Sequence, residues 1–249
     1  MTRHVGTYVE GDTCSHRWQA SKRAIRDFSS GAIPYKSATA IARMRWGVAH
    51  LAKIATYVRQ GKTAGVKRKY GGQQSFSLKP FSTFWWPWEN NAHHIIPRST
   101  LASVLDDISG AASPNEPTMF EVMVEGLLKE PYNLNDEPNM IMLPVRNDDA
   151  IDMGLPRHLE GSGVGTRDHP VYSDAVWAQT QGKLEPKYQA LASAIANNKH
   201  QEDEDPPAVR SVLEGISNAT YNAILAQAKL EYAAGSTDVS LDTVGPNMF

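Results

Sequence analysis

Histidines gathered in three short patches constrain this chain more than any other feature of its sequence. His93 and His94 form a pair between Asn91-Ala92 and Ile95-Ile96-Pro97-Arg98. His158 ends the stretch Leu155-Pro156-Arg157-His158, and His169 opens His169-Pro170-Val171-Tyr172. Imidazoles bind divalent metals, and one beside a metal can act as a general base near neutral pH. A fold that joins these patches would place metal-binding and proton-transfer groups together.

The composition is that of a soluble protein able to bury a core. The chain has 249 residues, of which 41% are hydrophobic and 21% charged, enough for one large domain or two small ones. No apolar run approaches the ~20 residues that span a bilayer, so no membrane partner is expected. The N-terminus lacks the apolar stretch of a secretory signal peptide, which predicts synthesis in the cytoplasm. A single cysteine, Cys14, excludes an internal disulfide framework and a cysteine-rich zinc site.

The small net charge of −2 conceals a strong asymmetry along the chain. Residues 1–80 carry 15 Lys/Arg against 3 Asp/Glu, whereas residues 81–249 carry 10 against 24. A basic segment is typical of proteins that contact phosphates. The acidic part has two possible uses, as a counter-surface within the monomer or as a docking place for a basic partner.

Several basic residues are candidates for nucleic-acid contact. The spacing of Ile41, Met44, Val48, Leu51, Ala55 and Val58 predicts an amphipathic helix over 38–60 with a basic outer face. That face could be solvated or could face DNA. A glycine-containing basic loop follows, and the candidate contacts are Lys67, Arg68, Lys69 and, farther on, Arg167.

The periodicity predicts a mostly helical α+β chain with one small β element around the histidines. A strand leads into 91–96, and a second covers the apolar run at 139–143 between two prolines. Helices are expected over residues 16–28, 99–110, 117–130, 170–181, 184–198 and 208–234.

Neighbouring side chains on a strand point to opposite faces. If His93 and His94 lie where a strand ends, one can face a metal while the other faces the substrate. A phosphodiester hydrolase needs both, because the metal stabilises charge on the phosphate and the leaving oxygen while the base takes a proton from water. The alternative is a structural zinc site, but the downstream Asn–strand–His–helix order favours the hydrolase.

The chain resembles the AHH nucleases at four places in order. These are Ala92-His93-His94-Ile95-Ile96-Pro97, Asn139-Met140-Ile141-Met142-Leu143-Pro144, Leu155-Pro156-Arg157-His158 and His169-Pro170-Val171-Tyr172. AHH nucleases belong to the HNH/endonuclease VII superfamily, also called His-Me finger or ββα-metal nucleases. The resemblance covers about residues 85–180 and implies a small ββα-metal core with helical insertions and with N- and C-terminal helical extensions.

The implied organisation has four parts. They are a basic helical region at 1–80, a nuclease core at 81–200, a C-terminal helix at 206–235 that packs on the core, and a loose tail at 236–249.

The resemblance also implies roles for individual residues. His93 would be a ligand of one divalent metal ion (Zn, Mg, Mn or Ni), His94 the general base, and Asn139 the residue that steadies the loop orienting the base. His158 or His169 would complete the metal site. Ten residues separate these two, more than in the compact family element, so which one binds metal and which contacts phosphate stays open. Met140 follows Asn139, at a position where members of the family commonly have a glycine.

Two further side chains lie in or directly after these motifs, and their chemistry suggests what each does. Arg98 could clamp the scissile phosphate bidentately or form a surface salt bridge. Tyr172, one turn into its helix, is expected to pack rather than to catalyse.

The resulting hypothesis is a metal-dependent DNA endonuclease. Family members are typically antibacterial toxins or secreted effectors that act in the cytoplasm of a target cell and are neutralised in the producer by a cognate immunity protein, with a secretion-system carrier as a further candidate partner. The rivals are an RNase on the same scaffold, a sequence-specific housekeeping or phage HNH enzyme, and a non-enzymatic nucleic-acid-binding or immunity-type protein with structural zinc.

Overall fold

The computed structural model describes residues 6–30, 65–67, 73–75, 81–82, 84, 88–110, 119–158, 169–197 and 208–249. Across these ranges the protein is mostly helical with small antiparallel sheets, which confirms the α+β class. The elements, in chain order, are α1 (His16–Ser30), β1 (Gly65–Lys67), β2 (Gln73–Ser75), β3 (Asn90–His94), α4 (Arg98–Ser109), α5 (Met119–Lys129), η1 (Glu137–Asn139), β4 (Met140–Pro144), α6 (Asn147–Met153), α7 (Pro170–Ala196), α8 (Arg210–Ala233), α9 (Leu241–Val244) and η2 (Gly245–Asn247).

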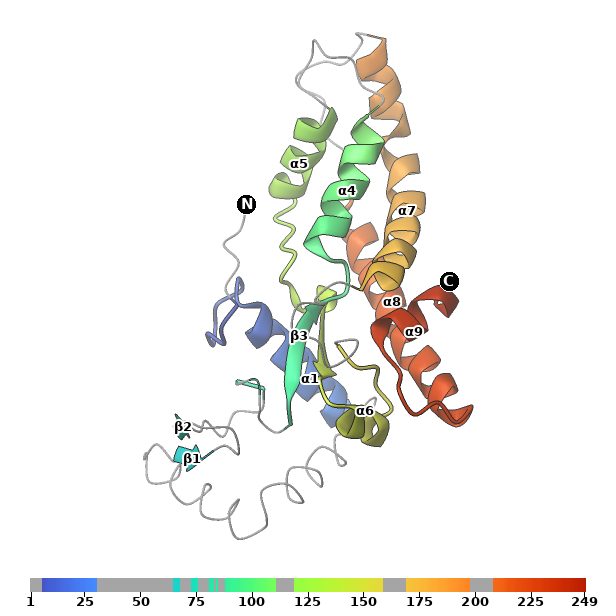
Figure 1. Ribbon diagram of the computed structural model, residues 1–249. Helices are drawn as coiled ribbons and strands as arrows, with labels where there is room; N and C mark the ends of the chain where they lie inside the picture. Colours follow the sequence, from blue (N-terminus) through green and yellow to red (C-terminus); the bar gives the residue numbers. More distant parts are fainter. Residues whose placement is uncertain are drawn as a thin grey trace.

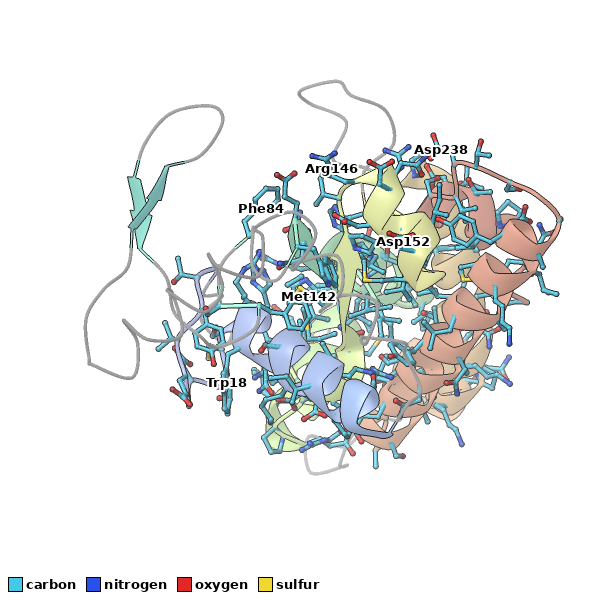
Figure 2. All side chains as sticks on the ribbon, turned by 90° about the horizontal axis from the view of Figure 1, so that it is seen from below. Trp18, Phe84, Met142, Arg146, Asp152 and Asp238 are labelled. Carbon is cyan, nitrogen blue, oxygen red and sulfur yellow. The ribbon has the colours of Figure 1, made fainter. Side chains whose placement is uncertain are left out.

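The antiparallel pair of β3 and β4 lies next to α1 and α6, below α4, α5 and α7 in the view of Figure 1. Asn90 pairs with Pro144 and His94 with Met140, so the histidine pair lies beside the start of β4. Every residue of β4 is buried, which is why its apolar run shows no alternation. Met142 of this strand is buried, whereas Phe84 and Asp152, also labelled in Figure 2, are exposed.

Helix α1 packs against both strands, and two buried arginines attach it. Arg17 donates to Asn90 Oδ1 (2.7 Å) and to the carbonyl of Phe81 (3.1 Å). Arg23 donates to the carbonyl of Pro138 (2.5 Å) and lies over the ring of Tyr221, 3.5 Å from its centroid. Buried guanidinium groups need such partners, because an uncompensated buried charge is costly. The α1 part of the basic 1–80 region is therefore built into the core.

One long helix, α7, replaces the two helices expected at 170–181 and 184–198. Pro186 lies inside it, although a proline in a helix interior typically costs about 3 kcal/mol. The buried side chains Val176, Leu184 and Tyr188 lie on both sides of this proline. Their burial against the neighbouring helices outweighs the lost backbone hydrogen bond, so the prediction of a break was wrong.

The last residues are ordered, which corrects the expectation of a loose tail at 236–249. Ser240 and Thr243 form a reciprocal capping box that starts α9. Leu241 and Val244 are fully buried, and Met248 is nearly so. The apolar positions of this short segment are too few to show a period, so the sequence did not reveal its packing. None of the described helices is both long and apolar enough to cross a membrane.

Candidate metal centre and its histidines

The end of β3 places His93 and His94 on opposite sides of the strand. The His93 ring meets the rings of His158 and His169 with centroids 5.0 and 5.6 Å away. The His94 ring instead faces His16 of α1, at 5.6 Å, and the side chain of Asn135. Strand alternation therefore separates the two imidazoles as the sequence predicted.

His93, His158 and His169 form a cluster whose candidate ligand atoms all lie within 4.8 Å of one another. His93 Nδ1 and His158 Nε2 are 3.1 Å apart. Two nitrogens of a tetrahedral zinc site, each about 2.0–2.1 Å from the ion, are about 3.3 Å apart. The pair is thus already near the spacing that one metal ion requires, and both downstream histidines join the cluster.

The chemistry of the cluster fits a metal. Burial, and then the neighbouring histidines, hold the pKa of His93 well below 6.5, and burial with His169 lowers the pKa of His158 to about 3. Neutral imidazoles have no proton to lose before they bind a metal. His93 Nε2 is buried and has no hydrogen-bond partner among the described residues. A buried nitrogen in this state is normally satisfied by an ion or a water, so the His93 ring offers two candidate ligand atoms, this Nε2 and the Nδ1 that lies near His158.

These pKa shifts predict that the metal-free protein loses stability as the pH falls below about 6.5. In the unfolded chain each histidine titrates near 6.5, whereas folded His158 titrates near 3. Between these values the unfolded chain binds protons that the folded protein does not, so acid favours unfolding and the stability is fully present only above the unfolded pKa. Urea unfolding midpoints measured with EDTA from about pH 7.5 to about pH 5 should fall steadily.

A His158→Gln variant is the control for this titration, because it removes one of the shifted groups. Its midpoint should depend less on pH over the same range, where few carboxylates have begun to titrate. Parallel profiles for the variant and the original protein would show that His158 is not held neutral by the fold.

His94 is oriented by an asparagine that the sequence analysis did not single out. Asn135 is buried, and its Oδ1 lies 2.9 Å from His94 Nε2. Asn133 accepts from the backbone N–H of Asn135 through its side-chain oxygen (3.0 Å) and donates to the carbonyl of Thr13 (2.9 Å). An amide oxygen can only accept, so Nε2 of a neutral His94 carries the proton and Nδ1 keeps its lone pair.

Asn139 fixes the turn that follows the histidine pair. Its Oδ1 accepts from the backbone N–H of Ile96 (2.7 Å), and its Nδ2 donates to the carbonyl of the same residue (3.1 Å). Ser217 of α8 also donates to Oδ1 (2.9 Å). The buried amide thus makes the bonds expected of a residue that steadies this loop.

Of the remaining predicted contacts, one is exposed and the others lie in segments whose side chains are outside the described part of the chain. Arg98 is exposed at the first position of α4, directly after the turn. Lys67 ends β1, of which the structure describes only the backbone, and Arg68, Lys69, Arg167 and the helix expected at 38–60 are not among the described residues.

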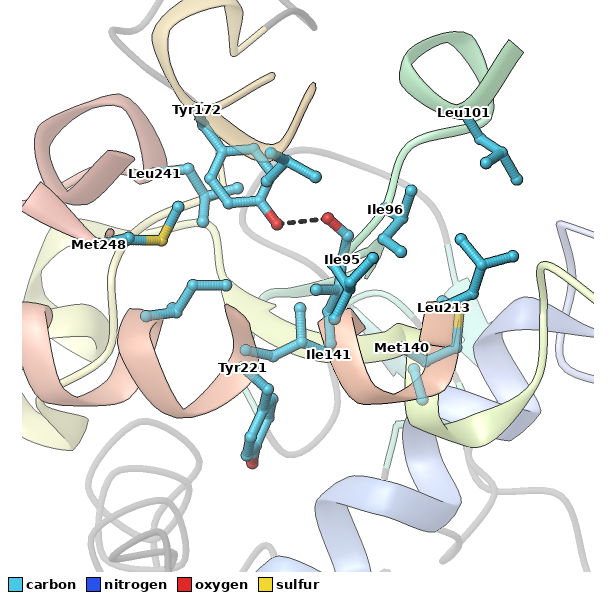
Figure 3. Close-up of a cluster of buried hydrophobic side chains, with 14 of the residues drawn as sticks. Ile95, Ile96, Leu101, Met140, Ile141, Tyr172, Leu213, Tyr221, Leu241 and Met248 are labelled. Atoms are coloured by element: carbon cyan, nitrogen blue, oxygen red, sulfur yellow. Dashed lines mark hydrogen bonds between the residues drawn. The ribbon is translucent and has the colours of Figure 1, made fainter. Parts of the chain in front are cut away.

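Tyr172 packs against the His93 ring, with the ring centroids 5.5 Å apart, as expected of a residue that packs. It is fully buried, and its hydroxyl donates to the carbonyl of Ile95 (2.6 Å), as Figure 3 shows. Its backbone N–H donates to Asp242 Oδ1 (2.9 Å). Tyr172 therefore joins the turn after His94 to the C-terminal segment.

The C-terminal segment also holds the stretch that carries His158. Arg157 donates through its backbone N–H to the carbonyl of Val239 (2.7 Å), and its carbonyl accepts from Leu241 (3.2 Å). Its guanidinium forms a bidentate ion pair with Asp238 at 2.6–2.8 Å. Residues 238–245 thus contact the chain beside both downstream histidines.

Comparisons of the chain with protein-family models, curated proteins and solved structures return no match.

Proposed function

We propose that this protein is a metal-dependent endonuclease that hydrolyses phosphodiester bonds of DNA. The observation that carries the proposal is that His93 and His94, at the end of β3, have different surroundings. His93 lies in a cluster of three imidazoles, while His94, on the other side of the strand, contacts Asn135 through Nε2, so that Nδ1 is the nitrogen that would accept a proton. A phosphodiester hydrolase needs these two functions within one site.

In this proposal β3, β4 and α7 are the three elements of a ββα-metal finger. His93, His158 and His169 would hold the ion, and Asn139 would keep the turn after His94 in place. When bound, the divalent ion would supply positive charge to the phosphate and the leaving oxygen. His94 Nδ1 would take the proton of the attacking water, and Arg98 would contact the phosphate from the exposed start of α4.

The set of ligands favours a catalytic over a structural metal. Structural zinc sites are closed by four protein ligands, whereas catalytic sites use three and leave one position open. The cluster found among the described residues has three, all imidazole. Imidazole suits Zn²⁺ or Ni²⁺ better than Mg²⁺, which prefers oxygen, so we favour these, with Mn²⁺ next.

The test is cleavage of supercoiled plasmid and total RNA side by side with Zn²⁺, Ni²⁺, Mn²⁺ or Mg²⁺. We expect metal-dependent nicking of the plasmid that EDTA stops and that His93→Ala loses. Cleavage of RNA alone would identify an RNase, and discrete fragments would identify a sequence-specific enzyme. Metal binding by folded protein without cleavage of either substrate would identify a structural zinc module.

The biological setting follows from the sequence resemblance alone. In this proposal the protein is an antibacterial effector that a secretion system carries into a target cell and that an immunity protein neutralises in the producer. Expression in the cytoplasm of a bacterial host should arrest growth and degrade DNA, and the His94→Ala variant should not. Growth at the normal rate with active protein would contradict a toxin.

A further inference from the structure

A side chain beside the cluster, Asn91, has no role in the chemistry described above. It lies two residues before His93 on β3, so both side chains point to the same side of the strand. Its amide lies 3.4 Å from His158 Nδ1, the nitrogen on the far side of that ring from His93. Asn91 therefore lies behind one of the three candidate ligands.

We infer that Asn91 positions His158 for metal binding by accepting a hydrogen bond from its Nδ1–H. This inference rests on the proposed metal centre. His158 Nε2 is the nitrogen that faces His93, at 3.1 Å. A neutral imidazole whose Nε2 lone pair binds a metal must carry its proton on Nδ1. That proton then requires an acceptor on the side where Asn91 lies.

An asparagine can meet this requirement in either state of the site. Its Nδ2 donates to a bare Nδ1 lone pair, which is the contact observed here. Turned by half a rotation about the bond to its amide group, it offers Oδ1 to an Nδ1–H instead. A leucine offers neither, and an aspartate offers only oxygens. The three side chains have the same number of non-hydrogen atoms and branch at the same carbon, and Asn91→Asp is nearly identical in size, so the set separates the hydrogen bond from the shape of the side chain.

Partners of this kind normally affect the metal affinity strongly. A ligating histidine usually donates its other N–H to a carboxylate, carbonyl or water, and loss of that partner typically weakens metal binding by about ten- to hundredfold. We expect a loss of this size for Asn91→Leu. Asn91→Asp should bind at least as tightly as the original protein, because its oxygen accepts the same bond.

The experiment measures Zn²⁺ affinity by competition with a chromophoric chelator. It also determines which nitrogen of His158 carries the proton, from ¹H–¹⁵N correlation spectra of the imidazoles. We expect the Zn²⁺-loaded protein to show His158 with a slowly exchanging Nδ1–H and a metal-bound Nε2, a signal kept in Asn91→Asp and lost in Asn91→Leu. Asn222→Asp, an exposed site on α8, adds the same charge elsewhere and should leave the affinity unchanged.

The outcomes distinguish this inference from the proposed function. Unchanged affinity in Asn91→Leu, or a Zn²⁺-loaded His158 protonated on Nε2, would overturn the role of Asn91 while leaving a nuclease possible. Zn²⁺ binding with the expected variant pattern but without DNA cleavage would support Asn91 and reject the nuclease. Failure of the original protein to bind Zn²⁺ at the three histidines would overturn both.

Discussion

Replacing His94 with alanine is expected to abolish most phosphodiester cleavage without weakening metal binding. General-base catalysis typically contributes about 10²- to 10⁴-fold to a rate, so the initial rate of plasmid nicking should fall by that factor. The metal affinity should remain unchanged, because His94 lies on the opposite side of the strand from the cluster and bonds to Asn135 instead. Chelator competition and plasmid nicking on the same preparation measure the two effects.

His158→Ala is the matched control for this variant, because it removes an imidazole of the cluster, which lies on the other side of β3 from His94. It should lose both metal affinity and cleavage, whereas His94→Ala should lose only cleavage. An Asn135→Ala variant should cleave plasmid at a rate between those of the original protein and His94→Ala. His94 keeps its ring there but loses the bond that sets its protonated nitrogen. If His94→Ala cleaved plasmid at the original rate, another group would have to be the base.

The parts of the site that were predictable from sequence are those set by local rules. Strand alternation separates His93 from His94, and the apolar run between Pro138 and Pro144 marks the buried β4. Both rules act over a few residues and leave a visible pattern. The place of Asn139 beside the turn after the histidine pair was implied by the family resemblance and not by these rules; its amide bonds to Ile96 of that turn.

The unpredicted parts are contacts between residues far apart in the chain. Asn135 meets His94 across 41 residues, and Asn91 meets His158 across 67. Asn133 and Asn135 do carry one local signal, since alternating asparagines before an Asp-Glu-Pro stretch are typical of turns. That signal predicts a loop but not the ring that the loop orients. Only the fold reveals which side chain lies behind each imidazole.

The C-terminal segment is the clearest case of such a long-range contact, and it carries the second large prediction. Gly245 packs against the start of α7, where a Cβ atom would lie 2.9 Å from Tyr172 Cα and 3.0 Å from its backbone nitrogen. Backbone atoms cannot turn aside as a flexible side chain can. We therefore expect Gly245→Ala to destabilise the fold by about 1–3 kcal/mol, as overpacked cores typically do.

The same substitution should weaken metal binding, because His169 lies three residues before Tyr172. Moving η2 away from α7 would strain the bond from the Tyr172 N–H to Asp242 and shift the end of the helix that carries the ligand. Thermal unfolding with EDTA should show a melting temperature lower by about 2–12 °C. Chelator competition should show weaker Zn²⁺ binding in the same variant.

Gly215→Ala separates this effect from a general effect of replacing a glycine. Gly215 is exposed within α8, and a Cβ built there meets no atom within 4 Å. Alanine should stabilise that helix by about 0.5–1 kcal/mol and leave Zn²⁺ affinity unchanged. If Gly245→Ala matched Gly215→Ala in both measurements, the C-terminal segment would not hold α7 in place. Reduced stability with full Zn²⁺ affinity would show that the segment supports the fold without positioning His169.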